Sequence, residues 1–148
     1  MRYWDASALV PIVVREPHTE AVRTWATKDP AIVTWAWSGV EIISAVERRA
    51  REGALTRSQR RLVLARFAAL AAAWDEVSDV LAVRARAIPL LARHPLRAAD
   101  AAQLAAASLV NEHLDAPLRF VCLDARLADA AEREGLVVMP EPDGDASM

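Results

Sequence analysis

Short apolar runs alternate with longer segments of helical periodicity along this chain of 148 residues. Five runs are typical of buried strands: 2–4, 31–34, 76–78, 119–123 and 137–139. Seven longer segments have the spacing of helices: one that begins near Ser7, then 18–28, 38–52, 56–73, 79–93, 98–113 and 125–134. Strands that alternate with helices indicate an α/β fold with a mostly parallel central sheet.

Local signals place the ends of several predicted helices. Ser7 and Thr56 have the hydroxyl side chains of helix N-caps, at the starts of the first and fourth helices. Gly53 and Gly135 follow the third and seventh helices, where a left-handed glycine commonly ends a helix. The third helix carries an apolar stripe that we expect to face the core, made of Val40, Ile43, Val46 and Ala50.

The composition is that of one folded domain. Apolar residues make up 54% of the chain, which is enough for a core in a domain of this size. We predict a single domain over 1–139 and an acidic, disordered tail over 140–148, where Glu141, Asp143 and Asp145 have no basic neighbour. No apolar run is long enough to cross a bilayer and none has the features of a signal peptide, so we expect a soluble, cytoplasmic protein.

Cysteine and histidine usage excludes several kinds of site. The single cysteine, Cys122, rules out an internal disulfide and a multi-cysteine zinc site. The histidines at 18, 94 and 113 lie far apart, without the paired spacing of zinc ligands. A metal ion in this protein would therefore have to be held by carboxylates.

Four acidic residues, which we call the acidic quartet, stand where predicted strands and helices meet: Asp5, Glu41, Asp100 and Asp124. Asp5 and Asp124 each follow a strand and precede a helix, and an open parallel sheet binds its ligands beyond the carboxyl ends of its strands. Glu41 and Asp100 lie in the first turns of predicted helices. Each acid alone is equally well explained as a helix cap or as a favourable charge beside the helix dipole. That explanation does not account for all four acids marking the same kind of junction.

If the four carboxylates converge, they need a cation. Two carboxylates about 4 Å apart repel by about 4 kcal/mol at an effective dielectric constant of about 20. Ligation by oxygen alone suits Mg²⁺ or Mn²⁺, and Mg²⁺ characteristically shares its coordination with waters and phosphate oxygens. The pattern therefore indicates phosphoester chemistry.

These residues resemble the motifs of PIN-domain nucleases, and most closely those of the VapC-type toxins of type II toxin–antitoxin systems. The resemblance covers nearly the whole chain, from residue 3 to residue 139. Its motifs include Asp5 and Ser7 in "DASALV", Glu41 in "VEIISAVERR", Asp100 in "LRAADAAQLAAA" and Asp124 in "FVCLDARLADAAEREGL". The order and separation of the four acids carry the resemblance, since each motif alone is common in α/β proteins.

Two positions depart from the pattern of this family. Leu123 stands where many relatives have a hydroxyl residue before the last acid, which weakens the support for a second metal ion. Gln103 stands where histidine is common, and we expect it to lie off the acidic quartet. Neither departure removes a carboxylate.

The resemblance implies a three-layer α/β/α sandwich and a Mg²⁺- or Mn²⁺-dependent endoribonuclease site. In this interpretation Asp5 and Asp100 are direct ligands of the principal ion. Glu41 and Asp124 complete the catalytic, metal-binding cluster by holding a second ion or orienting water, and Ser7 steadies it through a hydrogen bond. Metal-activated water then hydrolyses the RNA phosphodiester, leaving 5′-phosphate and 3′-hydroxyl ends. The family also implies a small antitoxin protein as partner, and a homodimer.

An acidic centre needs basic residues around it to attract the RNA backbone. The formal net charge is −2 and becomes +1 without the acidic tail, so the local placement of arginines matters more than their sum. Arg97 is the favoured RNA-binding residue because it lies three residues before Asp100, and the other candidates are Arg48, Arg49 and Arg51. The tryptophans at 25, 35, 37 and 74 are equally well explained as core residues or as interface residues.

Two other functional classes compete with the nuclease. An aspartate-nucleophile phosphotransferase of the haloacid-dehalogenase kind would want a second aspartate where Ser7 stands, and a receiver domain would want a late lysine, whereas the one lysine is Lys28. Both are disfavoured. The remaining alternative is a catalytically weak or inactive PIN-like module that binds RNA or protein, and it is disfavoured by the presence of all four acids.

Overall fold

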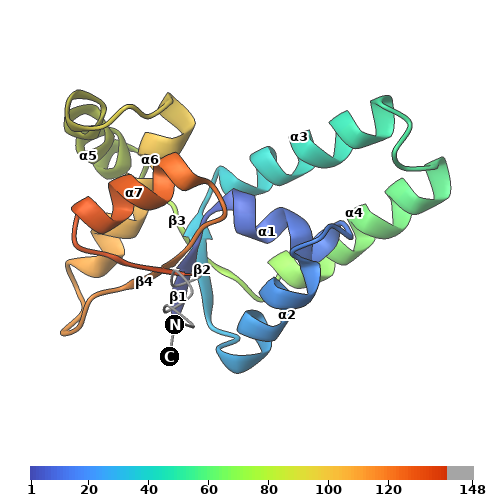
Figure 1. The fold of residues 1–148 in the computed structure, drawn as a ribbon, viewed down its shortest axis with the longest axis horizontal. Coiled ribbons are helices and arrows are strands. Elements are labelled where there is room, and N and C mark those ends of the chain that lie inside the picture. The colour runs from blue at the N-terminus through green and yellow to red at the C-terminus, as the bar shows by residue number, and fades with distance from the viewer. Residues whose placement is uncertain (140–148) are drawn as a thin grey trace, which may run out of the picture.

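Five parallel strands form the centre of the described structure (Figure 1). The computed structural model describes residues 1–139, and the predicted acidic tail at 140–148 lies outside them. The strands are β1 (Arg2–Trp4), β2 (Ile32–Trp35), β3 (Asp75–Val77), β4 (Arg119–Val121) and β5 (Val137–Met139). Their order in the sheet is β3-β2-β1-β4-β5, with every neighbouring pair parallel. The prediction of a mostly parallel sheet is confirmed.

Helices cover both faces of this sheet. In the described residues they are α1 (Ala6–Val13), α2 (Thr19–Lys28), α3 (Ser38–Arg51), α4 (Arg57–Ala71), α5 (Val80–Arg93), α6 (Ala98–Asn111) and α7 (Ala125–Arg133). Helices α1 to α4 lie on one face and α5 to α7 on the other, which confirms the three-layer α/β/α sandwich (Figure 1). Helices α3 and α4 extend together away from the sheet, and we call this pair the arm (Figure 1). No helix within residues 1–139 combines the length and the apolar character that spanning a membrane requires.

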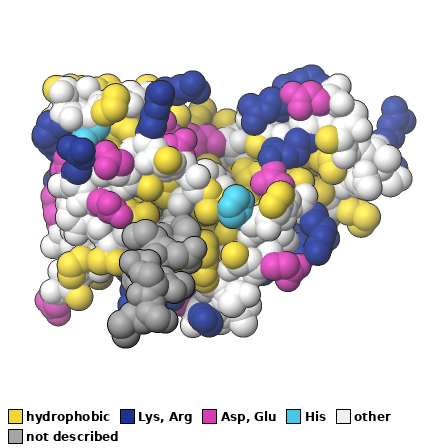
Figure 2. Space-filling model, in the orientation of Figure 1, with side chains coloured by type: hydrophobic (Ala, Val, Ile, Leu, Met, Phe, Trp, Pro, Cys, Tyr) yellow, Lys and Arg dark blue, Asp and Glu magenta, His cyan; other side chains and the backbone are white. Residues whose placement is uncertain are grey.

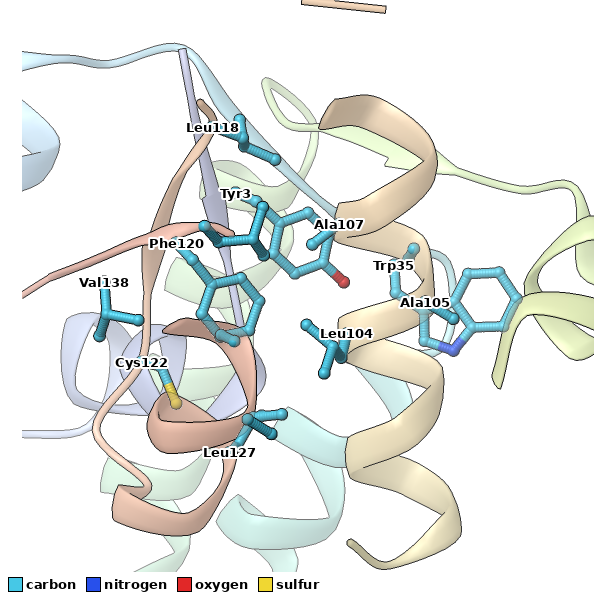
Figure 3. Close-up of a cluster of buried hydrophobic side chains, with 14 of the residues drawn as sticks. Tyr3, Trp35, Leu104, Ala105, Ala107, Leu118, Phe120, Cys122, Leu127 and Val138 are labelled. Carbon is cyan, nitrogen blue, oxygen red and sulfur yellow. The ribbon is translucent and has the colours of Figure 1, made fainter. Parts of the chain in front are cut away.

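Successive side chains of each strand point to opposite faces of the sheet, and each face has its own hydrophobic core. Tyr3 and Phe120 belong to the core on the α5–α7 side, where their stacked rings lie 5.4 Å apart between centroids. Trp4 and Val121, the next residue on each strand, belong to the core on the α1–α4 side. The alanine-rich α6 packs directly on the first core through residues 104–107 (Figure 3).

The tryptophans divide between core and surface. Trp35 is buried in the α5–α7 core, and Trp25 and Trp74 are partly buried against the α1–α4 core. Trp37 is 60% exposed. Burial in the core therefore accounts for three of these four side chains, and Trp37 presents its ring to solvent.

The helix ends follow the predicted signals with one correction. Asp5, and not Ser7, is the N-cap of α1, because its carboxylate accepts a hydrogen bond from the Ser7 backbone N–H at 3.2 Å. Thr56 caps α4 as predicted, in a capping box. Gly53 and Gly135 follow α3 and α7 with φ angles of +78° and +89°, a conformation that glycine adopts without strain.

The buried face of α3 differs from the predicted stripe. Val40 and Ile43 are 48% and 39% exposed, whereas Ile42, Ala45 and Val46 are buried. The adjacent isoleucines create two overlapping apolar stripes in the sequence. Packing of α3 against α1 and α4 selects the stripe that contains Ile42.

The strand order places a topological switch point between β1 and β4. From β1 the chain passes over one face to β2, whereas it reaches β4 from the other face, after α5 and α6. The carboxyl ends of β1 and β4 are adjacent, since the Asp5 N–H donates to the Val121 carbonyl oxygen at 3.0 Å. In an open parallel sheet such a point forms a crevice where ligands bind.

We predict that Leu104→Ala lowers the free energy of unfolding by about 2–5 kcal/mol. Leu104 is fully buried, so its truncation leaves a cavity in the α5–α7 core. Leu62→Ala is the matched control, because Leu62 is 66% exposed and its loss should change the free energy by less than about 0.5 kcal/mol. Urea unfolding followed by circular dichroism measures both, and equal effects would contradict this assignment of the core.

Candidate active site

The acidic quartet lies around the switch point between β1 and β4. Asp5 follows β1 directly, Asp124 lies three residues after the end of β4, and they are the N-caps of α1 and α7. Glu41 and Asp100 lie in the first turns of α3 and α6. Asp5 is only 4% exposed, Glu41 and Asp100 are partly buried, and Asp124 is exposed. The quartet therefore runs from the buried sheet edge to the surface.

The four carboxylates influence one another electrostatically. The pKa of Asp5 is raised to about 6, chiefly by burial and further by the charge of Asp100, against the lowering effect of its hydrogen bonds. Burial and the charges of Asp5 and Asp100 raise the pKa of Glu41 to about 7. Burial and the charge of Asp124 raise the pKa of Asp100. The fold thus gathers the predicted acids into one electrostatically coupled cluster.

The quartet has the donor chemistry for a divalent cation. No salt bridge within residues 1–139 includes one of its carboxylates, and unpaired buried charge is costly. Carboxylate oxygens are the ligands that Mg²⁺ and Mn²⁺ prefer, so the residues fit such an ion in type and charge. They do not form a closed shell, since among residues 1–139 no group of three or more histidine, cysteine, aspartate or glutamate side chains has the arrangement of a metal site.

A compact set of hydrogen bonds fixes the Asp5 carboxylate. The Ser7 hydroxyl donates to Asp5 Oδ2 and accepts from the Leu123 N–H at 3.0 Å, which ties the β1–α1 junction to the β4–α7 junction. The Cys122 thiol donates to the same Asp5 oxygen at 3.6 Å. Burial raises the pKa of this thiol, so the sulfur remains protonated. Cys122, predicted only as a buried strand residue, also supplies a hydrogen-bond donor to the site.

Gln103 contacts the quartet, and the expectation that it lies off the quartet is wrong. Its Nε2 donates to Glu41 Oε2 at 2.7 Å and to Ser38 Oγ at 2.9 Å. Residues three apart on a helix share a face, so Gln103 is turned toward the same edge of the sheet as Asp100. A polar residue at this spacing in an otherwise apolar, alanine-rich helix is the sequence signal that predicts the contact.

Arg97 and Arg126 stand beside the exposed end of the quartet. They line a depression of about 380 Å³ together with Asp100 and Asp124. Arg97 directly precedes α6, and its charge acts against the raised pKa of Asp100. Arg126 is a residue that the sequence patterns did not single out, although its position in the first turn of α7, two residues after Asp124, is a usable signal.

Arg48, Arg49 and Arg51 lie away from the quartet, near the C-terminal end of α3. The helix rises by about 15 Å between Glu41 and Arg51. Arg49 forms a salt bridge with Glu16, so its guanidinium already has an acidic partner. Basic side chains gather over this arm (Figure 2). The structure therefore places these three predicted RNA-binding residues on a surface separate from the quartet.

Comparisons with known proteins agree with this fold. The sequence matches none of the protein-family models against which it was compared. Ribonuclease VapC47 from Mycobacterium tuberculosis (strain CDC 1551 / Oshkosh) is 29% identical over 144 residues, which are 93% of this chain and 94% of that protein. A toxin–antitoxin complex from Klebsiella pneumoniae has a chain of similar fold, with a TM-score of 0.54 and 15% identity over 84% of this chain and 87% of that one. The match to VapC47 covers nearly the whole of both chains and the fold is shared, so this chain is similar to the VapC-type ribonucleases.

Proposed function

We propose that this protein is a VapC-type ribonuclease, the toxin of a toxin–antitoxin pair, and that it hydrolyses RNA phosphodiester bonds with the help of a divalent metal ion. The observation that carries the proposal is the gathering of four carboxylates, without a paired cation in residues 1–139, at the switch point of the sheet. The homologous VapC47 is named a ribonuclease, which supports the same reaction class.

Homology to VapC47 implies a metal cofactor, and the quartet is the group of residues that would hold it. Asp5 and Asp100 are the proposed direct ligands, since Asp5 is fixed by Ser7 and Asp100 faces the depression on the surface. Glu41 and Asp124 complete the cluster. When bound, Mg²⁺ or Mn²⁺ supplies an acidified water and positive charge beside the scissile phosphate.

The residues around the quartet orient the RNA and the carboxylates. Ser7 holds the Asp5 carboxylate against the β4–α7 junction, so that this ligand keeps one orientation. Arg97 and Arg126 line the depression beside Asp100 and Asp124, where their guanidinium groups would bind the phosphates that flank the scissile bond. A role in RNA binding for the arginines of the arm, 48, 49 and 51, stays a separate prediction.

The proposed partner is a small antitoxin protein that covers the active site in the cytoplasm. The similar chain from Klebsiella pneumoniae is part of a toxin–antitoxin complex, which supports such a partner. A homodimer is also proposed, because α5 presents apolar side chains to solvent: Val80, Leu81 and Ile88 are 60%, 63% and 63% exposed. Exposed apolar side chains on one helix are typical of interaction surfaces.

We predict that Asp5→Asn and Asp100→Asn each lower the rate of RNA cleavage by about 100-fold or more. Removal of a residue next to a metal ligand commonly costs 10- to about 100-fold, so loss of a ligand should cost at least as much. Purified protein is incubated with total RNA in Mg²⁺, Mn²⁺ or EDTA, and the products are resolved on a denaturing gel. Cleavage that persists in EDTA or in the double variant would exclude this mechanism. RNA that stays intact with the unaltered protein in either metal would favour the alternative of a binding module.

Asp5→Asn should raise the free energy of unfolding of the metal-free protein at pH 7 by about 1–3 kcal/mol. The folded protein raises the pKa of Asp5 to about 6, so an ionised Asp5 disfavours the folded state relative to the unfolded one. Asparagine keeps the helix cap without the charge. Asp75→Asn is the control, since Asp75 is exposed on β3. Urea titrations in EDTA measure both changes, and an Asp5→Asn protein less stable than the unaltered one would contradict the unpaired-charge argument.

Arg97→Ala and Arg126→Ala should each flatten the dependence of RNA affinity on salt, by about 0.7 in the slope of log K against log salt concentration for a single-stranded substrate. Binding is measured with the Asp100→Asn background, so that the RNA is not cut. Arg84→Ala on α5 is the matched control, because Arg84 is exposed and does not line the depression. A slope unchanged in both rim variants would remove these two residues from the RNA interface.

A further inference from the structure

One side chain on α6 has its hydrogen-bonding groups engaged by three residues of two other elements. Gln103 is only 1% exposed. Its Nε2 donates to Glu41 Oε2 at 2.7 Å and to Ser38 Oγ at 2.9 Å, both on α3, and its Oε1 accepts from the Tyr3 hydroxyl of β1 at 2.6 Å. Such complete pairing of a buried amide makes its position specific, because every alternative leaves a polar group unsatisfied.

The Tyr3 hydroxyl anchors the end of the amide that faces away from Glu41. The Glu41 carboxylate only accepts, so the amide nitrogen is directed toward α3, and the Tyr3 hydroxyl donates to the amide oxygen at the other end. Tyr3 cannot easily move, since it is fully buried and its ring stacks on Phe120 (Figure 3). Reversal of the amide would place its oxygen against the Glu41 carboxylate, where two acceptors repel.

The contact with Glu41 crosses the edge of the sheet. Gln103 comes from α6 on the α5–α7 face, whereas Glu41 comes from α3 on the opposite face. Thr34 of β2 connects the start of α3 to β1. Its hydroxyl donates to the Trp4 carbonyl oxygen at 2.7 Å and lies 2.7 Å from Ser38 Oγ. The start of α3 is therefore held to β1, β2 and α6 at once.

Glu41 needs such a restraint because its neighbours repel it. Asp5 and Asp100 carry the same charge, and a glutamate has enough rotatable bonds to swing toward solvent. Within residues 1–139, the bond from Gln103 is the one side-chain hydrogen bond that Glu41 accepts. A hydrogen bond to a charged group is stronger than one between neutral groups, so one amide can hold this carboxylate in place.

We propose that Gln103, anchored by the Tyr3 hydroxyl, is the positioning residue that holds the Glu41 carboxylate in the acidic quartet and thereby sets the affinity of the site for its divalent cation. The proposal rests on the proposed function for the identity of the ion. It assigns no contact between Gln103 and the ion or the RNA. The amide acts through Glu41 alone.

The test compares Gln103→Leu with Glu41→Gln and with the double variant. Mn²⁺ affinity is measured by isothermal titration calorimetry, and RNA cleavage is measured in parallel. Gln103→Leu should weaken both Mn²⁺ binding and cleavage by about 10- to 100-fold, as loss of a residue that orients a metal ligand commonly does. Added to Glu41→Gln, it should have almost no further effect, because the carboxylate on which it acts has gone. If the effects of the two substitutions multiply in the double variant, the proposal is overturned. Unchanged Mn²⁺ affinity in Gln103→Leu would overturn it as well.

Three further variants separate positioning from general damage to the fold. Tyr3→Phe keeps the stacked ring but removes the hydrogen bond that anchors the amide oxygen, so it should weaken Mn²⁺ binding in the same direction by a smaller factor. Gln103→His should restore part of the affinity, because the imidazole retains an N–H donor. Ser108→Ala is the matched control on the same helix, since Ser108 bonds only to the Leu104 carbonyl oxygen of its own helix among the described residues, and it should leave both readouts unchanged.

A crystal structure of Gln103→Leu distinguishes failure of this proposal from failure of the proposed function. The Glu41 carboxylate should leave its position beside residue 103 and turn toward solvent. If the unaltered protein neither binds Mn²⁺ nor cuts RNA, the proposed function fails, and the position of Glu41 in the variant still decides whether Gln103 holds it. A Glu41 carboxylate that stays in place without the amide would refute the positioning role.

Discussion

Repulsion between like charges is the constraint on which the rest of this structure depends. Four carboxylates are held within electrostatic reach of one another, and the pKa values of Asp5, Glu41 and Asp100 are raised as a result of burial and of this repulsion. Left to themselves, such groups would separate or take up protons. The fold prevents separation by attaching each acid to a strand end or to the first turn of a helix.

The parallel sheet makes this arrangement possible. β1 lies between β2 and β4 in the sheet. The chain leaves β1 over one face of the sheet and reaches β4 from the other face, so no connection covers the adjacent carboxyl ends of these two strands. Asp5 and Asp124 occupy this gap. The two cores on either side of the sheet then anchor the helices that bring Glu41 and Asp100 to the same edge.

Hydrogen bonds fix the orientations of two carboxylates of the quartet. Ser7 connects Asp5 to the β4–α7 junction, and Gln103 connects Glu41 to α6 and, through Tyr3, to β1. The free energy of these bonds offsets part of the repulsion among the carboxylates. This region is therefore less stable than an apolar core of the same size would be.

The sequence by itself determined the α/β class and all five strands within two residues, and it singled out the four acids as candidates, because apolar runs and strand-to-helix junctions are local patterns. It could not decide which isoleucine of α3 faces the core, because Ile42 and Ile43 are equally apolar and only contact with α1 and α4 separates them. The sequence also grouped Arg97, which stands beside the quartet, with the arginines of the arm as candidate RNA-binding residues. Gln103 and Glu41 are 62 residues apart in the chain, so their hydrogen bond exists only because tertiary packing brings α6 and α3 to one edge of the sheet.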